Sequence, residues 1–149
     1  MVGGYSLCVE NSHNSHRLLS LLSGVENVVL PKEPPGARYN RHMFPILLAD
    51  SREKNAVAMG MLKRNVDTSQ VYWNLLKEAY PLGYQKGCPV SESVSGRMLT
   101  LPNHSQLSDE EIDYVAEAFI ETLRAYRSTE FIHPTRIWRG EKKIPAEAR

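Results

Sequence analysis

His13 and His16 are spaced so that both imidazole rings would lie on one face of a helix. Two imidazoles can begin a zinc site, but zinc usually takes three or four protein ligands. No further pair of histidines or cysteines stands near them in the sequence. We therefore expect a solvated helix face here, with a metal site as the alternative.

Cys88, directly before Pro89, is a second candidate because a cysteine thiolate can act as a nucleophile. Such a cysteine needs a neighbouring base and a lowered pKa. His104 is the nearest histidine in the sequence, but it follows a predicted strand end, and nothing in the sequence brings the two together. We favour a buried structural thiol, so we assign no catalytic residue.

Short strands and amphipathic helices are predicted around these residues, which gives an α+β domain. Three strands are predicted at residues 42–49, 66–73 and 97–101, with a possible short strand at 25–30, and helical segments are predicted at 11–23, 50–64 and 74–80. Pro45 inside the first of the three strands favours an edge position or a bulge. The helix at 50–64 should bury Val57, Ala58, Met61 and Leu62.

The last helix has the clearest start signal in the chain. Ser108 is a natural N-cap and Glu111 follows three residues later, which completes a capping box. Leu107 and Ile112 occupy the positions of a hydrophobic staple. One apolar stripe follows at helical spacing: Ile112, Val115, Ala116, Phe119, Ile120 and Leu123. This periodicity ends after Ser128.

Length and composition indicate one soluble globular domain, with 149 residues, 42% hydrophobic residues and 23% charged residues. We divide the chain into an N-terminal lead-in (1–10), the domain itself (11–128) and a C-terminal tail (129–149). The net charge of +1 argues against nucleic-acid binding, and we expect the basic residues of the tail to be solvated.

Neither a secretory signal nor a membrane span is indicated by the sequence. The longest apolar run, residues 43–49, contains a proline and is too short to cross a bilayer. Cys8 and Cys88 are the only cysteines, which suggests reduced thiols. We therefore expect a cytoplasmic protein that binds neither membranes nor nucleic acid.

Two ordered blocks resemble the last segment of the DegT/DnrJ/StrS sugar aminotransferases, which use pyridoxal phosphate (PLP). The first runs from Tyr39 to Ile46 and continues with Ser51-Arg52-Glu53. The second is the stretch 87–123, with its Cys-Pro, its strand ending in Leu-Pro and its capped helix. With the material between them, the resemblance covers about residues 11–125.

The resemblance implies a small α+β domain, in which a short and mostly antiparallel sheet packs against helices. In the family this domain closes over the active site of a larger domain and helps to form the dimer. The larger domain carries the Schiff-base lysine in a His-His-x-x-Lys context, and also the aspartate that pairs with the pyridine nitrogen. No lysine of this chain stands in that context, so we expect no bound cofactor, and PLP only if a separate large domain is supplied.

The resemblance also suggests His42, Tyr72, Trp73 and Arg97 for an inherited ligand pocket, because they match segments that face the cofactor domain. Aromatic and arginine side chains suit a sugar-nucleotide-like ligand. Tyr72 and Trp73 could equally be core or interface residues, and they replace the usual family pattern of tyrosine, proline and histidine with Tyr72-Trp73-Asn74.

We therefore expect a non-catalytic binding or assembly module that forms a homodimer. The alternative is the small-domain half of a split aminotransferase that pairs with a separate PLP-binding chain. A third and weaker possibility is a new small-ligand binder that uses the old domain face.

Overall fold

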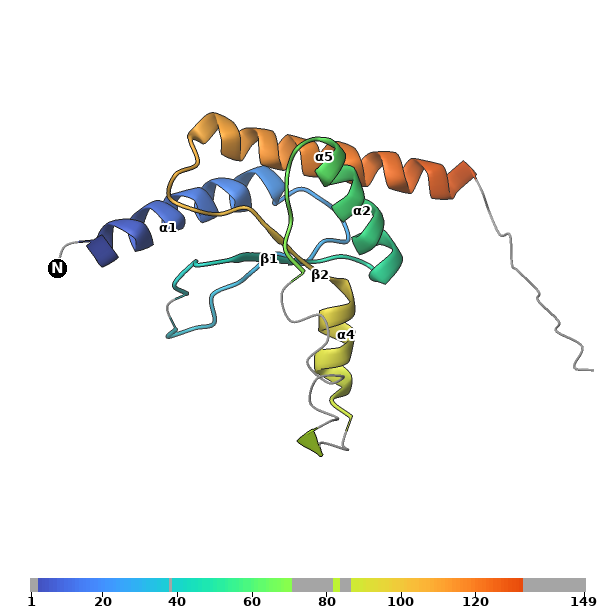
Figure 1. Ribbon diagram of the computed structural model, residues 1–149, viewed down its shortest axis with the longest axis horizontal. Helices are drawn as coiled ribbons and strands as arrows, with labels where there is room; N and C mark the ends of the chain where they lie inside the picture. The colour runs from blue at the N-terminus through green and yellow to red at the C-terminus, as the bar shows by residue number, and fades with distance from the viewer. Residues whose placement is uncertain (1–2, 38, 71–81, 84–86, 133–149) are drawn as a thin grey trace, which may run out of the picture.

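The computed structural model describes residues 3–37, 39–70, 82–83 and 87–132 (Figure 1). The elements in these residues are, in chain order, α1 (Gly3–Leu22), β1 (Phe44–Leu47), α2 (Ser51–Lys63), α4 (Pro89–Arg97), β2 (Met98–Leu101) and α5 (Asp109–Ile132). The predicted α+β class is confirmed. Among the described residues, no helix is both long and apolar enough to cross a membrane.

β1 and β2 pair antiparallel, with Phe44 opposite Leu101 and Leu47 opposite Met98. The strands predicted at 25–30 and 66–73 are each reduced, within the described residues, to a single bridge: Val29 pairs with Leu47, and Ser69 pairs with Thr100. The helical segment predicted at 74–80 lies outside the described residues.

Pro45 is accommodated in β1 by the hydrogen-bond pattern of the sheet. Both backbone groups of Thr100, its partner in β2, are bonded to Ser69 at 2.8 and 3.1 Å. The Pro45–Thr100 pair is therefore a non-hydrogen-bonded pair of the β1–β2 ladder, where a missing N–H breaks no bond between these strands. Pro45 therefore fits inside β1 without breaking the ladder, although a proline was expected to favour an edge strand or a bulge.

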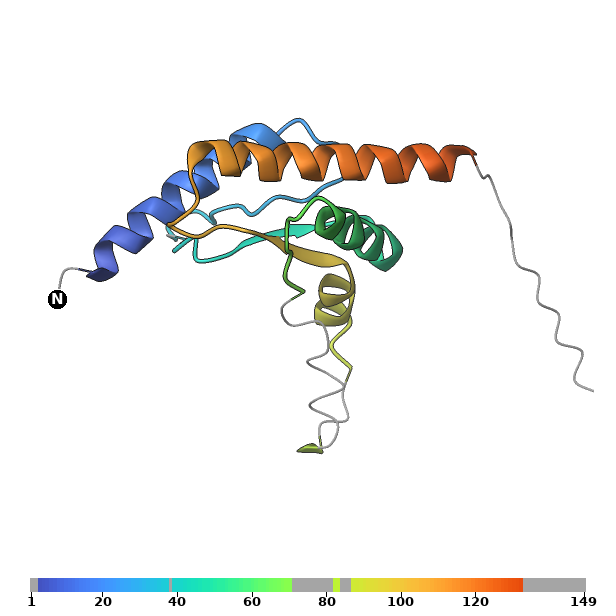
Figure 2. The same ribbon diagram turned by 45° about the horizontal axis from the view of Figure 1, so that its top comes forward.

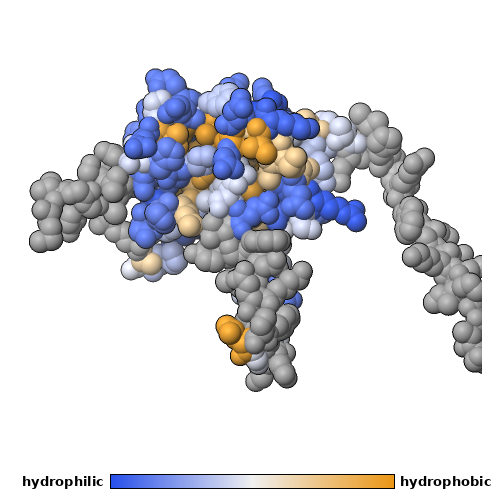
Figure 3. All heavy atoms as spheres, in the orientation of Figure 1, coloured by the Kyte–Doolittle hydropathy of each residue, from blue (hydrophilic) through white to orange (hydrophobic). Residues whose placement is uncertain are grey.

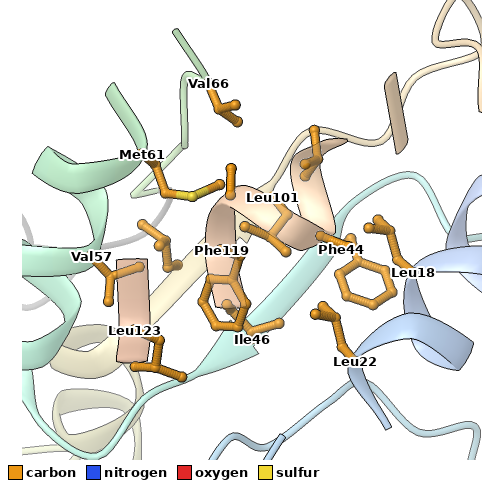
Figure 4. Close-up of a cluster of buried hydrophobic side chains, with 14 of the residues drawn as sticks. Leu18, Leu22, Phe44, Ile46, Val57, Met61, Val66, Leu101, Phe119 and Leu123 are labelled. Carbon is orange, nitrogen blue, oxygen red and sulfur yellow. The ribbon is translucent and has the colours of Figure 1, made fainter. Parts of the chain in front are cut away.

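The helices α1, α2 and α5 form a layer over one face of the sheet, and α5 packs along both α1 and α2 (Figures 1 and 2). The side chains between these layers make up the core (Figure 4). The largest fully buried side chains come from every one of these elements: Leu18, Leu22, Phe44, Ile46, Leu48, Val57, Met61, Leu99, Leu101, Ile112, Phe119 and Leu123.

α5 forms as its sequence predicts. The Ser108 N–H donates to Glu111 Oε2 at 2.8 Å, and the Glu111 N–H donates to Ser108 Oγ at 3.2 Å, so the capping box is confirmed. Every member of the predicted stripe is buried or partly buried against the core. The helix continues to Ile132, so residues 129–132, which were assigned to the tail, are helical; later residues lie outside the described part.

Asp50 is the N-cap of α2, and its carboxylate accepts the N–H groups of Arg52 and Glu53. Val57 and Met61 are buried as predicted, but the prediction for Leu62 is wrong, because its side chain is 56% exposed. The buried stripe instead runs through Lys54, Val57 and Met61 at i, i+3 and i+7. Leu62 lies one residue, about 100° of helix rotation, beyond this stripe.

Gly60 allows α2 and α5 to approach closely. A methyl group at this position would lie 2.3 Å from Cγ2 of Thr122, a residue that is buried in α5. We expect Gly60→Ala to lower the free energy of unfolding by about 1–3 kcal/mol through overpacking, despite the better helix propensity of alanine.

Thr122→Ser gives the matched control, because it removes Cγ2 and keeps the hydroxyl that accepts from Arg64 Nε. The double variant Gly60→Ala/Thr122→Ser should recover most of the loss in a urea melt. A Gly60→Ala variant that is as stable as the parent would show that the two helices separate easily.

Two helical segments were not predicted. α1 begins at Gly3, within the range 1–10 that we expected to be a lead-in. α4 occupies residues expected to be a short connecting segment; Pro89 stands in its first turn, and the Glu92 N–H donates to the Cys88 carbonyl. α4 contacts α2 but projects away from the rest of the fold, and none of its residues is fully buried (Figures 1 and 2).

Candidate functional site

Of the four residues suggested for an inherited pocket, the structure describes two, His42 and Arg97. His42 precedes β1, whereas the carbonyl of Arg97 accepts the N–H of Leu48 just after β1. The two residues are thus about six strand positions apart, or roughly 20 Å. Tyr72 and Trp73 lie outside the described residues.

His42 is exposed, and the loop that carries it is fixed by buried polar residues. Arg41, in a left-handed conformation (φ 53°), is buried, and its carbonyl accepts from Asn103 Nδ2 at 2.7 Å. Asn103 Nδ2 also donates to Ser15 Oγ at 2.9 Å. This network joins the loop to α1, and it was not predicted, because its members are far apart in the sequence.

Arg97 lies at the junction of α4, β2 and α2, and its guanidinium has no acceptor for the buried Nε among the described residues. Lys54, on the same side of the fold in the first turn of α2, is 5% exposed, and its Nζ donates to Gln70 Oε1 at 3.1 Å. Burial lowers the pKa of Lys54. No described carboxylate forms an ion pair with either side chain.

Lys54 was not predicted as a site residue, although the register of α2 could have revealed it. It stands three residues before Val57 and seven before Met61, so it shares their inward face. Helix periodicity identifies buried positions by spacing alone, but the sequence-based prediction for α2 included only apolar residues on the inward face.

PLP does not fit the described lysines. A Schiff-base lysine must reach an open site that also holds a partner for the pyridine nitrogen. Lys54 is buried and lines neither of the two cavities described below. Lys32 and Lys63 are exposed on the surface.

The histidine and cysteine candidates do not form a metal or nucleophile site in the described residues. His13 Nε2 lies 2.9 Å from Asp109 Oδ1, whereas His16 Nδ1 lies 2.7 Å from the Ser12 carbonyl of its own helix. No group of three or more metal-ligating side chains occurs in the described part of the chain. α4 runs directly into β2; Cys88 stands before α4 and His104 follows β2, so the two residues lie at opposite ends of this helix–strand segment.

Arg17 joins α1 to the first turns of α5. Its Nε and Nη2 donate to the two carboxylate oxygens of Asp113 at 2.7 Å each, and its Nη1 donates to Asp109 at 2.9 Å. The hydrogen bond from Arg17 holds the pKa of Asp113 below its usual value.

A folded-state pKa that is depressed in this way stabilises the protein above the unfolded-state pKa, and the effect is lost as the pH falls through the folded-state pKa. We expect Asp113→Asn to lower the free energy of unfolding at pH values above about 5. The difference from the parent should shrink as the pH falls toward the lowered pKa of Asp113. Urea melts across this range test it, and a difference that does not change with pH would contradict it.

A groove opens between the segment 65–69, the end of β2 and the start of α5, with a volume of ≈ 440 Å³. Its floor includes the buried Val66, Leu101 and Val115. Asp67, His104, Glu111 and Tyr114 also line it. Glu111 is occupied by the capping box, and Tyr114 donates to the Arg64 carbonyl at 2.9 Å, so both help to fix the walls of the groove.

Comparisons with known proteins agree on one family. The model of the DegT/DnrJ/EryC1/StrS aminotransferase family matches residues 7–120. A dTDP-4-dehydro-2,3,6-trideoxy-D-glucose 4-aminotransferase from Saccharopolyspora spinosa is 36% identical over 110 residues, which cover 72% of this chain and 28% of that protein.

Solved structures show the same domain. The aminotransferase TlmJ from Streptoalloteichus hindustanus matches with a TM-score of 0.73 and 25% identity, over 80% of this chain and 32% of that one. The putative sugar aminotransferase Spr1654 from Streptococcus pneumoniae matches with a TM-score of 0.75 and 22% identity, over 85% of this chain and 33% of that one. The chain thus spans about a third of the length of these relatives, and it belongs to the DegT/DnrJ/EryC1/StrS aminotransferase family.

Proposed function

We propose that this chain is an assembly domain of the sugar aminotransferase type, which supplies binding surface and not the cofactor lysine. The observation that supports this most strongly is the exposure of α4, in which no residue is fully buried. A helix of nine residues is too short to be stable alone in water, and α4 is exposed at residues 89–93 and only half-buried at residues 94–97. A partner that covers α4 would supply the missing burial.

We call α4, together with residues 82–83 at its far end, the arm (Figure 1), and its exposed side chains suit such a contact. Val90 is 77% exposed in the first turn of α4, and Leu82 is 87% exposed at the far end of the arm. Figure 3 shows one hydrophobic patch near the tip of the arm. Exposed apolar groups that gather on a projecting element are typical of interaction surfaces.

A second copy of the chain is the partner we propose first. A twofold axis lets one apolar surface cover its own copy, so a single exposed arm is enough to form a homodimer. The reducing compartment suggested by the two cysteines favours the cytoplasm as the place of assembly.

The second candidate partner is a PLP-binding region, on whichever polypeptide carries it. The observation that favours it is the length of the relatives, since this chain covers 28% of the curated aminotransferase and about a third of the solved ones. The half-buried Arg97 at the base of the arm would then suit a phosphate of a nucleotide sugar. The related DesI was solved in the presence of its TDP-sugar product.

Val90→Asp tests the assembly proposal, because it places a charge in the proposed contact. Sedimentation equilibrium at micromolar protein should show association of the parent chain, weakened about tenfold or more by the change, which corresponds to about 1.4 kcal/mol. Ser91→Asp is the matched control, since it adds the same charge to an exposed neighbouring position and should change association much less.

The same variants are then mixed with the PLP-binding region of a related aminotransferase. Binding that Val90→Asp weakens would support the second candidate. A parent chain that is monomeric at every concentration and does not bind that region would contradict both.

A further inference from the structure

A second cavity lies between the end of α1, the loop that follows it and the middle of α5. Its volume is ≈ 420 Å³, within the usual range of small-ligand sites of about 300–1,000 Å³. Leu21, Val25, Ile120 and Leu123 supply apolar walls, and Arg124 and Arg127 supply the basic groups. We call it the α1–α5 cavity.

Arg127 has one donor that the described protein does not use. Its Nε donates to Glu53 Oε1 at 2.7 Å, and its Nη1 donates to the Glu26 carbonyl at 2.8 Å. These two bonds fix the guanidinium in place. Its Nη2 is buried, and no described residue accepts a hydrogen bond from it. The Arg127 guanidinium is therefore a fixed, positively charged part of the cavity wall.

Arg124 adds a second cation beside the first. It stands one turn before Arg127 on α5, so the two side chains share a face of that helix. No described carboxylate forms an ion pair with it, and its side chain is exposed at the cavity. Glu53 already balances the charge of Arg127, so Arg124 carries the charge that a ligand could neutralise.

We propose that the α1–α5 cavity binds a small carboxylate that has an apolar body. Its carboxylate would pair with Arg124, whose side chain is exposed at the cavity, because arginine pairs well with carboxylates. The apolar body would cover Leu21, which is 41% exposed, together with Val25 and Ile120. Glu26 also borders the cavity, and its negative charge would oppose the ligand.

Isothermal titration calorimetry with hexanoate tests the proposal, and hexanamide is the uncharged comparison. Hexanoate should bind saturably in the millimolar range and hexanamide at least several-fold more weakly. Arg124→Gln should weaken hexanoate binding about fivefold or more, and Glu26→Gln should strengthen it, because these changes alter the charge at the cavity in opposite directions.

Lys63→Gln is the control for overall charge, since Lys63 is exposed at the other end of α2 from Glu53 and should leave binding unchanged. In parallel NMR spectra, hexanoate should shift the amide signals of Gly24 and Glu26. The proposal is overturned if hexanoate shows no saturable binding, if hexanamide binds as well, or if Lys63→Gln weakens binding as much as Arg124→Gln.

Discussion

Replacing Phe119 with alanine should lower the free energy of unfolding by about 3–5 kcal/mol, the largest effect we expect from a single apolar substitution. The Phe119 side chain is 0% exposed and lies in the middle of the core, where α5 faces the sheet (Figure 4). Truncation would remove the ring's contacts and leave a cavity that a rigid two-layer core cannot fill.

Glu117→Ala is the matched control for this prediction, because Glu117 is exposed on the same helix and carries no core contact. It should change stability by no more than about 0.5 kcal/mol in the same denaturant melt. A Phe119→Ala variant that behaves like Glu117→Ala would mean that α5 does not present this stripe to the core.

Replacing Arg127 with methionine should lower the free energy of unfolding by roughly 2–4 kcal/mol. Glu53, whose side chain is 6% exposed, would then keep a buried charge without its cation. The expected loss is below that of a fully buried pair, because the Arg127 side chain is 32% exposed and solvent partly screens it.

The double variant Glu53→Gln/Arg127→Met separates the ion pair from simple packing. An amide at position 53 is neutral and can still accept the Ala49 N–H, which now donates to Glu53 Oε2 at 2.8 Å. The double variant should therefore be more stable than Arg127→Met alone in urea melts. If it is less stable, the loss comes from packing and not from the unpaired charge.

Local signals predicted α5 well, because its cap and its stripe are both determined by residues close in sequence. Ser108 and Glu111 bond to each other within one turn, and the stripe around Phe119 needs only helical periodicity. Phe44 and Leu101 were likewise predicted in strands, since a short apolar run bounded by turn residues is enough to indicate a strand.

The parts that failed depend on distant contacts. Glu53 is buried because Arg127 reaches it from 74 residues away, and no local pattern predicts that pairing. The separation of His42 and Arg97 is likewise determined by the antiparallel register of β1 and β2, and the pocket suggested for them with Tyr72 and Trp73 stays a prediction. α4 was missed because its serines and its glycine give no amphipathic pattern.

Hydrogen exchange of the α4 amides tests the assembly account most directly. In a dilute and monomeric sample the amides of residues 90–97 should exchange rapidly, because no residue of the helix is fully buried in its own chain. They should become protected when sedimentation shows association, either with a second copy or with a PLP-binding region, while the core amides of α5 stay protected throughout. If α4 is equally protected at every dilution, or remains unprotected in the assembled complex, the arm is not the surface through which this domain assembles.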